Sequence, residues 1–308
     1  MTASDPAKPL KEFQPKHEFF VGIDSDGSVF DTMSIKQREC FCPWMIAYFR
    51  LQPVAQAARE CRDFADLFSK TRGANRHKTT RRVLAELLPD HPMTKARNFK
   101  VPQYPHYFAW VADPNSLLSN EGLKKTIGKT QNPQTKRELE LALAWSERVN
   151  WAIEEIVKGM PPFPYVRESL KKITSMADAI VVSGTPSEAL EREWQEHDVA
   201  QYVEVIAGQE MGPKTQHLEY ATKGKYGKNH VLMIGDAPGD MQAAKANDAL
   251  FYPINPGDEV TSWKRFHDEA FDKFIKGEYI GEYEERLIAE FDSYLPELPP
   301  WQQLKKGE

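Results

Sequence analysis

Two pairs of aspartates stand out, because each pair directly follows a short apolar run. Asp24 and Asp26 come after the run EFFVGI, and Asp236 and Asp240 follow the run VLMI. Carboxylates in such positions can act as a nucleophile, as a general acid or base, or as ligands of a hard metal ion. Two like charges about 4 Å apart repel by roughly 4 kcal/mol at an effective dielectric near 20. If the two pairs meet, we therefore expect a bound cation, with Mg²⁺ as the usual choice for an all-oxygen site that handles phosphate.

Each pair taken alone has a simpler interpretation. Acids commonly end strands as turn residues, and acids at a helix start are stabilised there without any function. The spacing of Asp24 and Asp26 adds some information, because side chains two apart on an extended segment point the same way. Gly27 permits a sharp turn immediately afterwards. The pattern is thus compatible with either a turn or a site.

Two further polar residues fit phosphate chemistry. Ser183 ends the run AIVV, and its hydroxyl could donate to a phosphoryl oxygen, although a plain turn serine is the alternative. Lys214 falls in the first turn of the helix expected after the Gly-Pro pair at 212–213. A cation is disfavoured there by the helix dipole, which points to function, with a solvated surface lysine as the alternative. Thr185 is expected to cap the helix that follows Ser183.

The elements that must position these residues are short strands. Apolar runs at 18–23, 179–182, 231–234 and 250–254 alternate with helical patterns, which predicts an α/β protein with a parallel sheet. Ligands of such sheets bind beyond the carboxyl ends of the strands, where the candidate residues lie.

A long helical insertion interrupts this alternation. Between residues 34 and 159 there is almost no strand signal, and helical stretches are expected near 34–50, 53–69, 76–88, 115–127 and 134–158. The Pro-rich linker at 160–164 closes the insertion. The predicted organisation is a polar arm over 1–16, a discontinuous core over 17–33 and 160–258, the helical insertion over 34–159, and a C-terminal helical extension over 259–308.

Composition limits the partners. The formal net charge of −5 gives no general attraction for nucleic acid or for an anionic membrane, so a small anionic substrate would need a local positive site. No apolar segment is long enough for a membrane span, and the N-terminus has no secretory pattern, so the default location is the cytoplasm. The three cysteines, Cys40, Cys42 and Cys61, fit a reducing compartment and are expected to be buried thiols. The sequence carries no signal for the oligomeric state.

The candidate residues together resemble the four motifs of the haloacid dehalogenase superfamily, in the family's order. The motifs are DSDGSV at 24–29, Ser183, Lys214 and GDAPGD at 235–240. The resemblance covers about half the chain. It implies an α/β, three-layer Rossmann-like parallel sheet core with an inserted all-helical cap of the C1 type. It also implies a magnesium-dependent phosphatase that hydrolyses a small phosphorylated metabolite.

The resemblance implies a role for each residue. Asp24 would attack phosphorus and become an aspartyl phosphate, while Asp26 would protonate the leaving oxygen and then activate water. Ser183, Gly184 and Lys214 would hold the phosphoryl oxygens. The proposed magnesium ligands are the Asp24 carboxylate, the Asp26 backbone carbonyl and Asp236, with Asp240 binding through water or orienting Lys214.

Other activities within the superfamily stay open to different degrees. Haloacid dehalogenases lack the acid at the position of Asp26, so dehalogenation is not expected. Phosphonatases use a Schiff-base lysine in the cap, and Lys36, Lys70 and Lys78 are candidates by region alone. A sugar phosphomutase would use the same residues as a phosphatase, and a binding protein with an unused site is a third class.

The most cationic part of the insertion, at 69–82, is a candidate for substrate selection. Arg72, Asn75, Arg76 and Lys78 could grip a second anionic group of the substrate. The alternative, which the pattern favours, is a solvated basic start of a helix.

Overall fold

The computed structural model describes residues 5–303, which form two compact units. The sheet unit comprises Met1–Met33 and Gly159–Tyr294, and the helical unit comprises Ser34–Lys158 and Leu295–Glu308, in each case over the described residues. Those parts of the expected arm and extension that fall on residues 1–4 and 304–308 lie outside the described residues. The boundaries expected for the arm, core, insertion and extension stay predictions.

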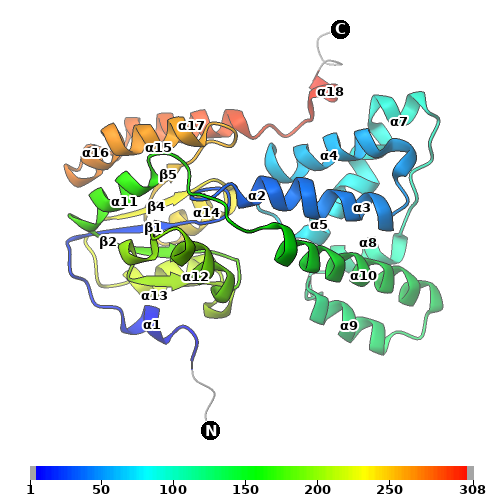
Figure 1. The fold of residues 1–308 in the computed structure, drawn as a ribbon, viewed down its shortest axis with the longest axis horizontal. Coiled ribbons are helices and arrows are strands. Elements are labelled where there is room, and N and C mark those ends of the chain that lie inside the picture. The colour runs from blue at the N-terminus through cyan, green and yellow to red at the C-terminus, as the bar shows by residue number, and fades with distance from the viewer. Residues whose placement is uncertain (1–4, 304–308) are drawn as a thin grey trace. The chain divides into compact units, whose positions relative to one another are not determined.

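The sheet unit is built on five parallel strands in the order β3-β2-β1-β4-β5 (Figure 1). The four predicted runs form β1 (Phe19–Ile23), β2 (Ala177–Val182), β4 (Val231–Gly235) and β5 (Leu250–Pro253). The sequence did not predict β3 (Val205–Ala207), a three-residue edge strand. The chain places β2 and β3 on one side of β1 and then β4 and β5 on the other side, so the strand order reverses at β1. Open α/β sheets bind their ligands at such a reversal.

Both faces of the sheet are buried, which is why the strands read as continuous apolar runs. Val21 and Ile23 belong to the main apolar cluster on one face. Gly22 points to the other face, where a Cβ atom would lie 2.9 Å from Leu218 Cδ2. That face has no room for a side chain at position 22, so glycine permits the close approach of the helix that carries Leu218.

Helices cover both faces, which confirms the expected three layers. The main cluster receives side chains from α11 (Val166–Thr174), α12 (Ser187–Glu196), α15 (Glu259–Arg265), the π-helical turn η6 (Phe266–Ala270) and α16 (Phe271–Ile275). On the other face α13 (Lys214–Thr222) packs against α14 (Pro238–Ala246), and Figure 1 shows α11 and α13 on opposite sides of the strands. The remaining helices are α17 (Glu282–Tyr294), which packs against β5, and α1 (Lys8–Glu12), which lies within the expected arm and buries Leu10.

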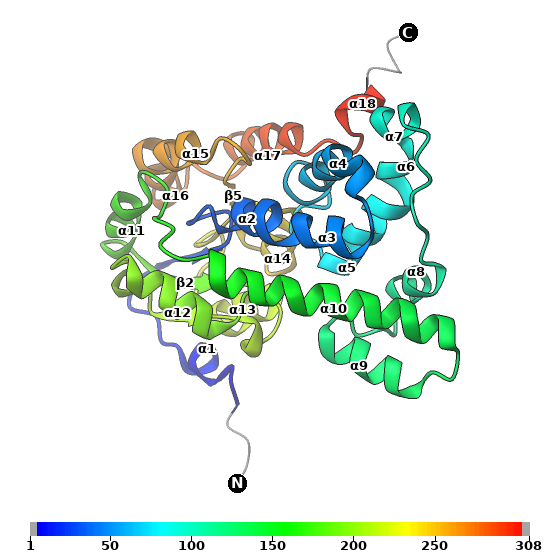
Figure 2. The same ribbon diagram turned by 45° about the vertical axis from the view of Figure 1, so that its right-hand side comes forward.

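Every regular element of the described helical unit is a helix, and α2 (Thr32–Ile35) leads into it. The long helix α10 (Pro133–Ile156) runs beside α9 (Asn120–Lys129) in Figure 2. Within the insertion, α7 (Pro92–Ala96) and α8 (Pro105–Ala112) fall outside the predicted helical stretches. The others are η1 (Lys36–Phe41), α3 (Cys42–Tyr48), η2 (Gln52–Val54), α4 (Ala55–Leu67), α5 (Arg76–Arg82), η3 (Val83–Leu87), α6 (Leu88–Asp90) and α18 (Pro300–Gln303). The expected extension is therefore divided, with α15 to α17 in the sheet unit and α18 in the helical unit. No helix within residues 5–303 combines the length and apolar character that a bilayer span requires.

Candidate active site

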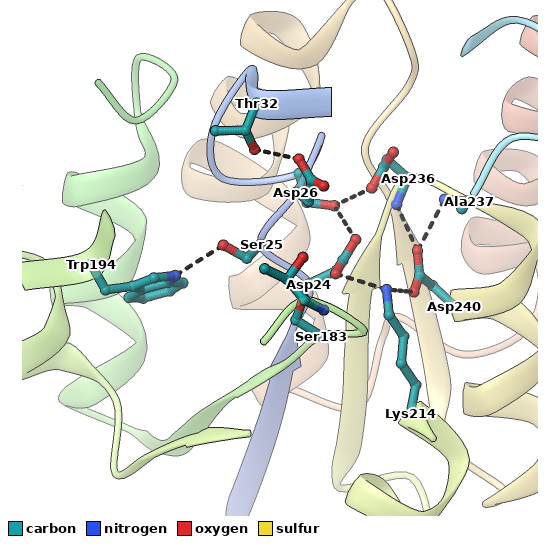
Figure 3. A network of polar contacts seen from close by, with 12 residues as sticks. Asp24, Ser25, Asp26, Thr32, Ser183, Trp194, Lys214, Asp236, Ala237 and Asp240 are labelled. Atoms are coloured by element: carbon teal, nitrogen blue, oxygen red, sulfur yellow. Dashed lines mark hydrogen bonds and ion pairs between the residues drawn. The ribbon is translucent and has the colours of Figure 1, made fainter. Parts of the chain in front are cut away.

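The two aspartate pairs meet at the carboxyl end of the sheet. Asp24 follows β1 and Asp236 follows β4, and these strands are neighbours, with the Asp24 N–H donating to the Ile234 carbonyl at 2.9 Å. Carboxylate oxygens of Asp24, Asp236 and Asp240 all lie within 4.8 Å of one another, and all three side chains are buried (Figure 3). The strand order reverses here, so the acidic cluster occupies the place where such sheets bind ligands.

A tight turn follows Asp24. The Ser25 carbonyl accepts hydrogen bonds from the backbone N–H groups of Ser28, Val29 and Phe30 at 3.3, 2.9 and 3.2 Å. Gly27 has φ of 89°, a conformation that glycine adopts without the strain a side chain would cause. The indole N–H of Trp194 donates to Ser25 Oγ at 3.0 Å and fixes the start of the turn. The chain consequently folds back over the acidic cluster.

Ser28 joins two of the carboxylates, a role that the sequence analysis missed. Its hydroxyl lies 2.7 Å from Asp236 Oδ1, to which it donates, and 3.5 Å from Asp24 Oδ2. Because Ser28 is fully buried, few other hydrogen-bond partners are available to its hydroxyl. Its place four residues after Asp24 was the signal that could have drawn attention to it.

Asp26 is oriented differently from the three clustered carboxylates. It is half-buried, and its Oδ1 accepts a hydrogen bond from the hydroxyl of the buried Thr32 (Figure 3). Its carboxylate is not part of the buried cluster of three. The proton-transfer role that the resemblance gives to Asp26 stays a prediction.

Lys214 is the first residue of α13, as the sequence predicts. Its Nζ lies 2.7 Å from Asp24 Oδ1 and 2.5 Å from Asp240 Oδ1. The residue breaks the usual charge preference of a helix start because two buried carboxylates are its partners. The single positive charge of Lys214 therefore contacts both the carboxylate of Asp24, the candidate nucleophile, and that of Asp240.

Asp240 is held by backbone donors at the entry to α14. Its Oδ2 accepts from the N–H groups of Asp236 at 3.2 Å and of Ala237 at 3.0 Å. This close approach depends on Gly235, where a Cβ atom would lie 2.4 Å from Asp240 Cβ and 2.5 Å from Asp240 Cγ. The glycine was not singled out from the sequence, because only the folded turn shows what its missing side chain makes room for.

Replacing Gly235 with alanine is expected to damage the site. Since the added methyl group must displace Asp240 or the backbone of β4, we expect a loss of about 1–3 kcal/mol in unfolding free energy. We expect turnover to fall by roughly 10–100-fold, as for other changes to residues that orient metal ligands. Thermal unfolding and steady-state kinetics measure the two effects.

The matched control is Gly239→Ala, four residues along the chain. A Cβ atom at Gly239 would meet no atom within 4 Å, and the residue lies in the first turn of α14. Alanine is favoured over glycine in a helix, so this variant should be as stable as the wild type or more so. Equal unfolding free energies and equal turnover of the two variants would contradict the proposed packing at Gly235.

The electrostatics of the cluster favour a cation. Burial raises the pKa of Asp24 well above its usual range, and although Lys214 lowers this pKa, the neighbouring Asp240 and Asp236 raise it further. Burial lowers the pKa of Lys214, but the carboxylates of Asp24 and Asp240 outweigh this and raise it above the ordinary value. Three carboxylates thus face one ammonium. An all-oxygen donor set with this excess of negative charge fits a hard divalent ion such as Mg²⁺.

Ser183 and Gly184 follow β2 on the other side of β1. Ile23 is opposite Val181, so Ser183 lies one residue beyond the level of Asp24 on the neighbouring strand. The Ser183 hydroxyl accepts from the N–H of Thr185 at 3.2 Å, and a Cβ atom at Gly184 would meet no atom within 4 Å. Gly184 borders open space, whereas Ser183 is buried, and the binding of phosphate by either residue stays a prediction.

The expected cap at Thr185 was wrong. Helix α12 begins at Ser187 with Pro186 before it. The carboxylate of Glu210 accepts from both the N–H and the hydroxyl of Ser187, at 3.0 and 2.9 Å. Glu210, 23 residues further along the chain than Ser187, therefore accepts the hydrogen bond from the helix start that Thr185 was expected to accept.

The four polar residues at 72–78 lie within the helical unit. Arg72 is buried and donates to the Leu67 carbonyl at 2.8 Å, and Asn75 caps α5 by accepting from the N–H of His77 at 2.9 Å. Arg76 donates to Asn150 Oδ1 at 2.6 Å, while Lys78 is exposed. Three of the four therefore have contacts inside this unit, and a substrate role for any of them stays a prediction.

The three cysteines are buried free thiols, as expected. Burial raises the pKa of the Cys40 thiol to about 11 and that of Cys42 to about 12. Among the described residues, the group of side chains suited to a metal is the aspartate cluster, and no cysteine belongs to it.

Fold and site together define a Rossmann-like α/β protein with a buried acidic site at the sheet's point of reversal. A model of the haloacid dehalogenase-like hydrolase family matches residues 112–252. The match includes Ser183, Lys214 and both later aspartates, and begins after Asp24 and Asp26. The segment from 112 to 252, slightly less than half of the chain, therefore matches the haloacid dehalogenase-like hydrolases.

Comparison with individual proteins is less specific. No curated protein matches the chain. A protein provisionally named phosphoglycolate phosphatase, from Lactobacillus delbrueckii, shares 14% identity at a TM-score of 0.49, over 85% of this chain and 98% of that one. A haloacid dehalogenase-like hydrolase from Streptococcus pneumoniae shares 11% identity at a TM-score of 0.39, over 80% and 90%. A protein provisionally named β-phosphoglucomutase, from Thermotoga maritima, shares 15% identity at 0.38, over 82% and 99%. The likeness to the hydrolase family rests on the family model over residues 112–252, and not on these structures.

Proposed function

We propose that the protein is a magnesium-dependent phosphatase that hydrolyses a small phosphorylated metabolite through an aspartyl phosphate on Asp24. The observation that carries the proposal is the position of Asp24. Its Oδ1 is 2.7 Å from Lys214 Nζ, and its carboxylate belongs to a buried cluster with Asp236 and Asp240. Oxygen ligands and a fixed ammonium around one carboxylate suit the transfer of a phosphoryl group, which depends on positioning and charge neutralisation.

Two steps complete the proposed reaction. An oxygen of Asp24 attacks phosphorus, the bond from phosphorus to the ester oxygen breaks, and Asp26 donates a proton to the departing oxygen. Asp26 then takes a proton from a water molecule whose oxygen attacks phosphorus. The bond from Asp24 to phosphorus breaks, which releases inorganic phosphate, restores the Asp24 carboxylate and leaves Asp26 protonated, as it was before the first step.

The residues around Asp24 supply binding and charge. Lys214 faces the negative charge of the phosphoryl group, and Ser183 with Gly184 would contact its oxygens from the neighbouring strand. The ion would be held by the Asp24 carboxylate, the Asp26 backbone carbonyl and Asp236, with Asp240 fixing Lys214 or a bound water. Bound Mg²⁺ would neutralise charge on the phosphoryl oxygens.

We propose that the helical unit is a cap of the C1 type, corresponding to residues 34–159, and that it selects the substrate. The overall charge of −5 supports a small anionic substrate over nucleic acid, because the protein has no general attraction for polyanions. The buried, narrowly spaced carboxylate cluster is suited to one phosphoryl group, which supports a monoester.

Metal removal tests the proposal. With 4-nitrophenyl phosphate as substrate, we expect turnover to stop in EDTA and to return when excess Mg²⁺ is added, because the clustered carboxylates need the cation's charge. The yields of nitrophenol and inorganic phosphate should be equal, which distinguishes hydrolysis from transfer to a sugar. Full activity after exhaustive chelation would contradict the proposed metal dependence.

A further inference from the structure

The C-terminal helices of the sheet unit reach the catalytic turn through one side chain. Trp263, in α15, is fully buried, and its indole N–H donates to the backbone carbonyl of Ser28 at 2.7 Å. We infer that Trp263 is a positioning residue that holds Ser28, and through it Asp24 and Asp236, in place for the metal ion. The inference rests on the proposed function and assigns these helices a part in it.

Ser28 is the link between the indole and the carboxylates. Its hydroxyl donates to Asp236 Oδ1 at 2.7 Å and lies 3.5 Å from Asp24 Oδ2. The backbone of Ser28 is otherwise held at its N–H by the Ser25 carbonyl, at 3.3 Å, which is long for a hydrogen bond. The indole is therefore the closer of these two backbone contacts, and it determines where the Ser28 hydroxyl sits.

The segment that carries Trp263 is itself anchored away from the catalytic turn. The next residue toward the N-terminus, Ser262, receives hydrogen bonds from Tyr252 Oη on its carbonyl at 2.5 Å and from the Asn255 N–H on its hydroxyl at 3.0 Å. Two residues beyond Trp263, Arg265 donates to both carboxylate oxygens of Glu290 in α17 at 2.8 and 2.9 Å. A bidentate pair of this kind fixes geometry as well as adding energy. The indole is thus held by β5 and α17 independently of the aspartates.

The indole N–H of Trp263, and not its ring alone, holds the Ser28 carbonyl. The Trp263 ring packs in the main apolar cluster and meets Phe266 edge-on with ring centroids 5.6 Å apart. A phenyl ring could supply most of that packing, but it has no donor for the Ser28 carbonyl. Trp263→Phe therefore separates positioning from packing.

We expect Trp263→Phe to weaken Mg²⁺ binding by about tenfold, with kcat lowered by a similar factor and KM for 4-nitrophenyl phosphate nearly unchanged, as for other residues that orient metal ligands. Isothermal titration with Mg²⁺ measures the binding without any turnover. A variant that binds Mg²⁺ as tightly as the wild type would overturn the inference.

The matched control is Tyr279→Phe. Tyr279 is also fully buried in the sheet unit, and its hydroxyl donates to the Phe251 carbonyl at 2.7 Å. Each substitution removes one buried donor to a backbone carbonyl and leaves an aromatic ring, so both should lower the melting temperature. Only Trp263→Phe should change Mg²⁺ binding. Equal Mg²⁺ affinities of the two variants would show a merely structural role for Trp263.

The experiment distinguishes a failure of the proposed function from a failure of the role inferred for Trp263. If the wild type binds Mg²⁺ but hydrolyses no phosphate ester, the proposed function fails, and the titration still tests Trp263. If Trp263→Phe does not fold, Glu290→Gln replaces it, because losing the charged pair with Arg265 loosens the same helix from a half-exposed position. Mg²⁺ affinity should then fall by a few-fold, and an unchanged affinity would equally overturn the inference.

Discussion

The variant Asp24→Asn is expected to remain folded and to lose turnover of 4-nitrophenyl phosphate by a factor on the order of 10⁴ or more. An amide has nearly the shape of a carboxylate but is a very weak nucleophile, so the first chemical step is lost. The substitution also removes one negative charge from a buried cluster of three carboxylates, which offsets the lost ion pair with Lys214. Steady-state kinetics and thermal unfolding measure the two effects.

The control for Asp24→Asn is the same change at Asp178. That carboxylate is also buried, and its Oδ2 accepts from the N–H groups of Lys16 at 3.0 Å and His17 at 3.1 Å and from Tyr226 Oη at 2.7 Å. Asp178→Asn should lower stability and leave turnover intact. Turnover of Asp24→Asn within tenfold of the wild type would contradict its role as nucleophile.

The second large effect is expected on stability. Lys214→Met leaves the carboxylates of Asp24 and Asp240 without their cation, and breaking a buried pair by removing one partner costs about 3–5 kcal/mol. The Lys214 side chain is 24% exposed, so we expect the lower end of this range in the absence of metal. Turnover should fall by roughly 10²–10³-fold, since a donor to the transferring group is lost.

Denaturant unfolding with and without Mg²⁺ measures this effect. We expect Mg²⁺ to bind the folded site and not the unfolded chain, and therefore to restore part of the lost stability. The control is Lys223→Met, which breaks a surface pair with Glu219 whose side chains are 76% and 40% exposed. Such exposed pairs contribute about 0–1 kcal/mol. Equal stability losses in the two variants would show that Lys214 has no special electrostatic role.

The sheet and the meeting of the aspartates could be predicted from the sequence. Strands buried on both faces give short apolar runs, and the carboxyl ends of parallel strands share one edge. Placing Asp24 and Asp236 after two such runs is then enough to predict their proximity. The edge strand β3 could not be predicted in the same way, because Val205 and Ile206 are only half-buried and the strand has three residues.

The residues that orient the site could not be found from the sequence, because their roles depend on distant parts of the chain. Ser28 and Asp236 are 208 residues apart, and Ser28 and Trp263 are 235 residues apart. Gly235 is conspicuous only when a side chain is built on it in the folded turn. No local pattern reports contacts of this kind.

Local sequence patterns also gave wrong predictions where a distant residue made the expected contact instead. Thr185 has the sequence of a helix cap, but the carboxylate of Glu210 accepts the hydrogen bond from the first residue of α12. A basic cluster looks the same whether its cations face solvent, a ligand or the protein. Only the coordinates show that Arg72 donates to the Leu67 carbonyl and Arg76 to Asn150.

Covalent labelling tests most directly whether Asp24 carries the phosphoryl group. The protein is mixed with 4-nitrophenyl phosphate labelled in its phosphoryl group, quenched in acid during turnover and digested, and the labelled peptide is identified by mass spectrometry. We predict label on the peptide that contains Asp24, and none with Asp24→Asn. Turnover that proceeds with no labelled peptide, or with the label on another residue, would contradict the proposed nucleophile.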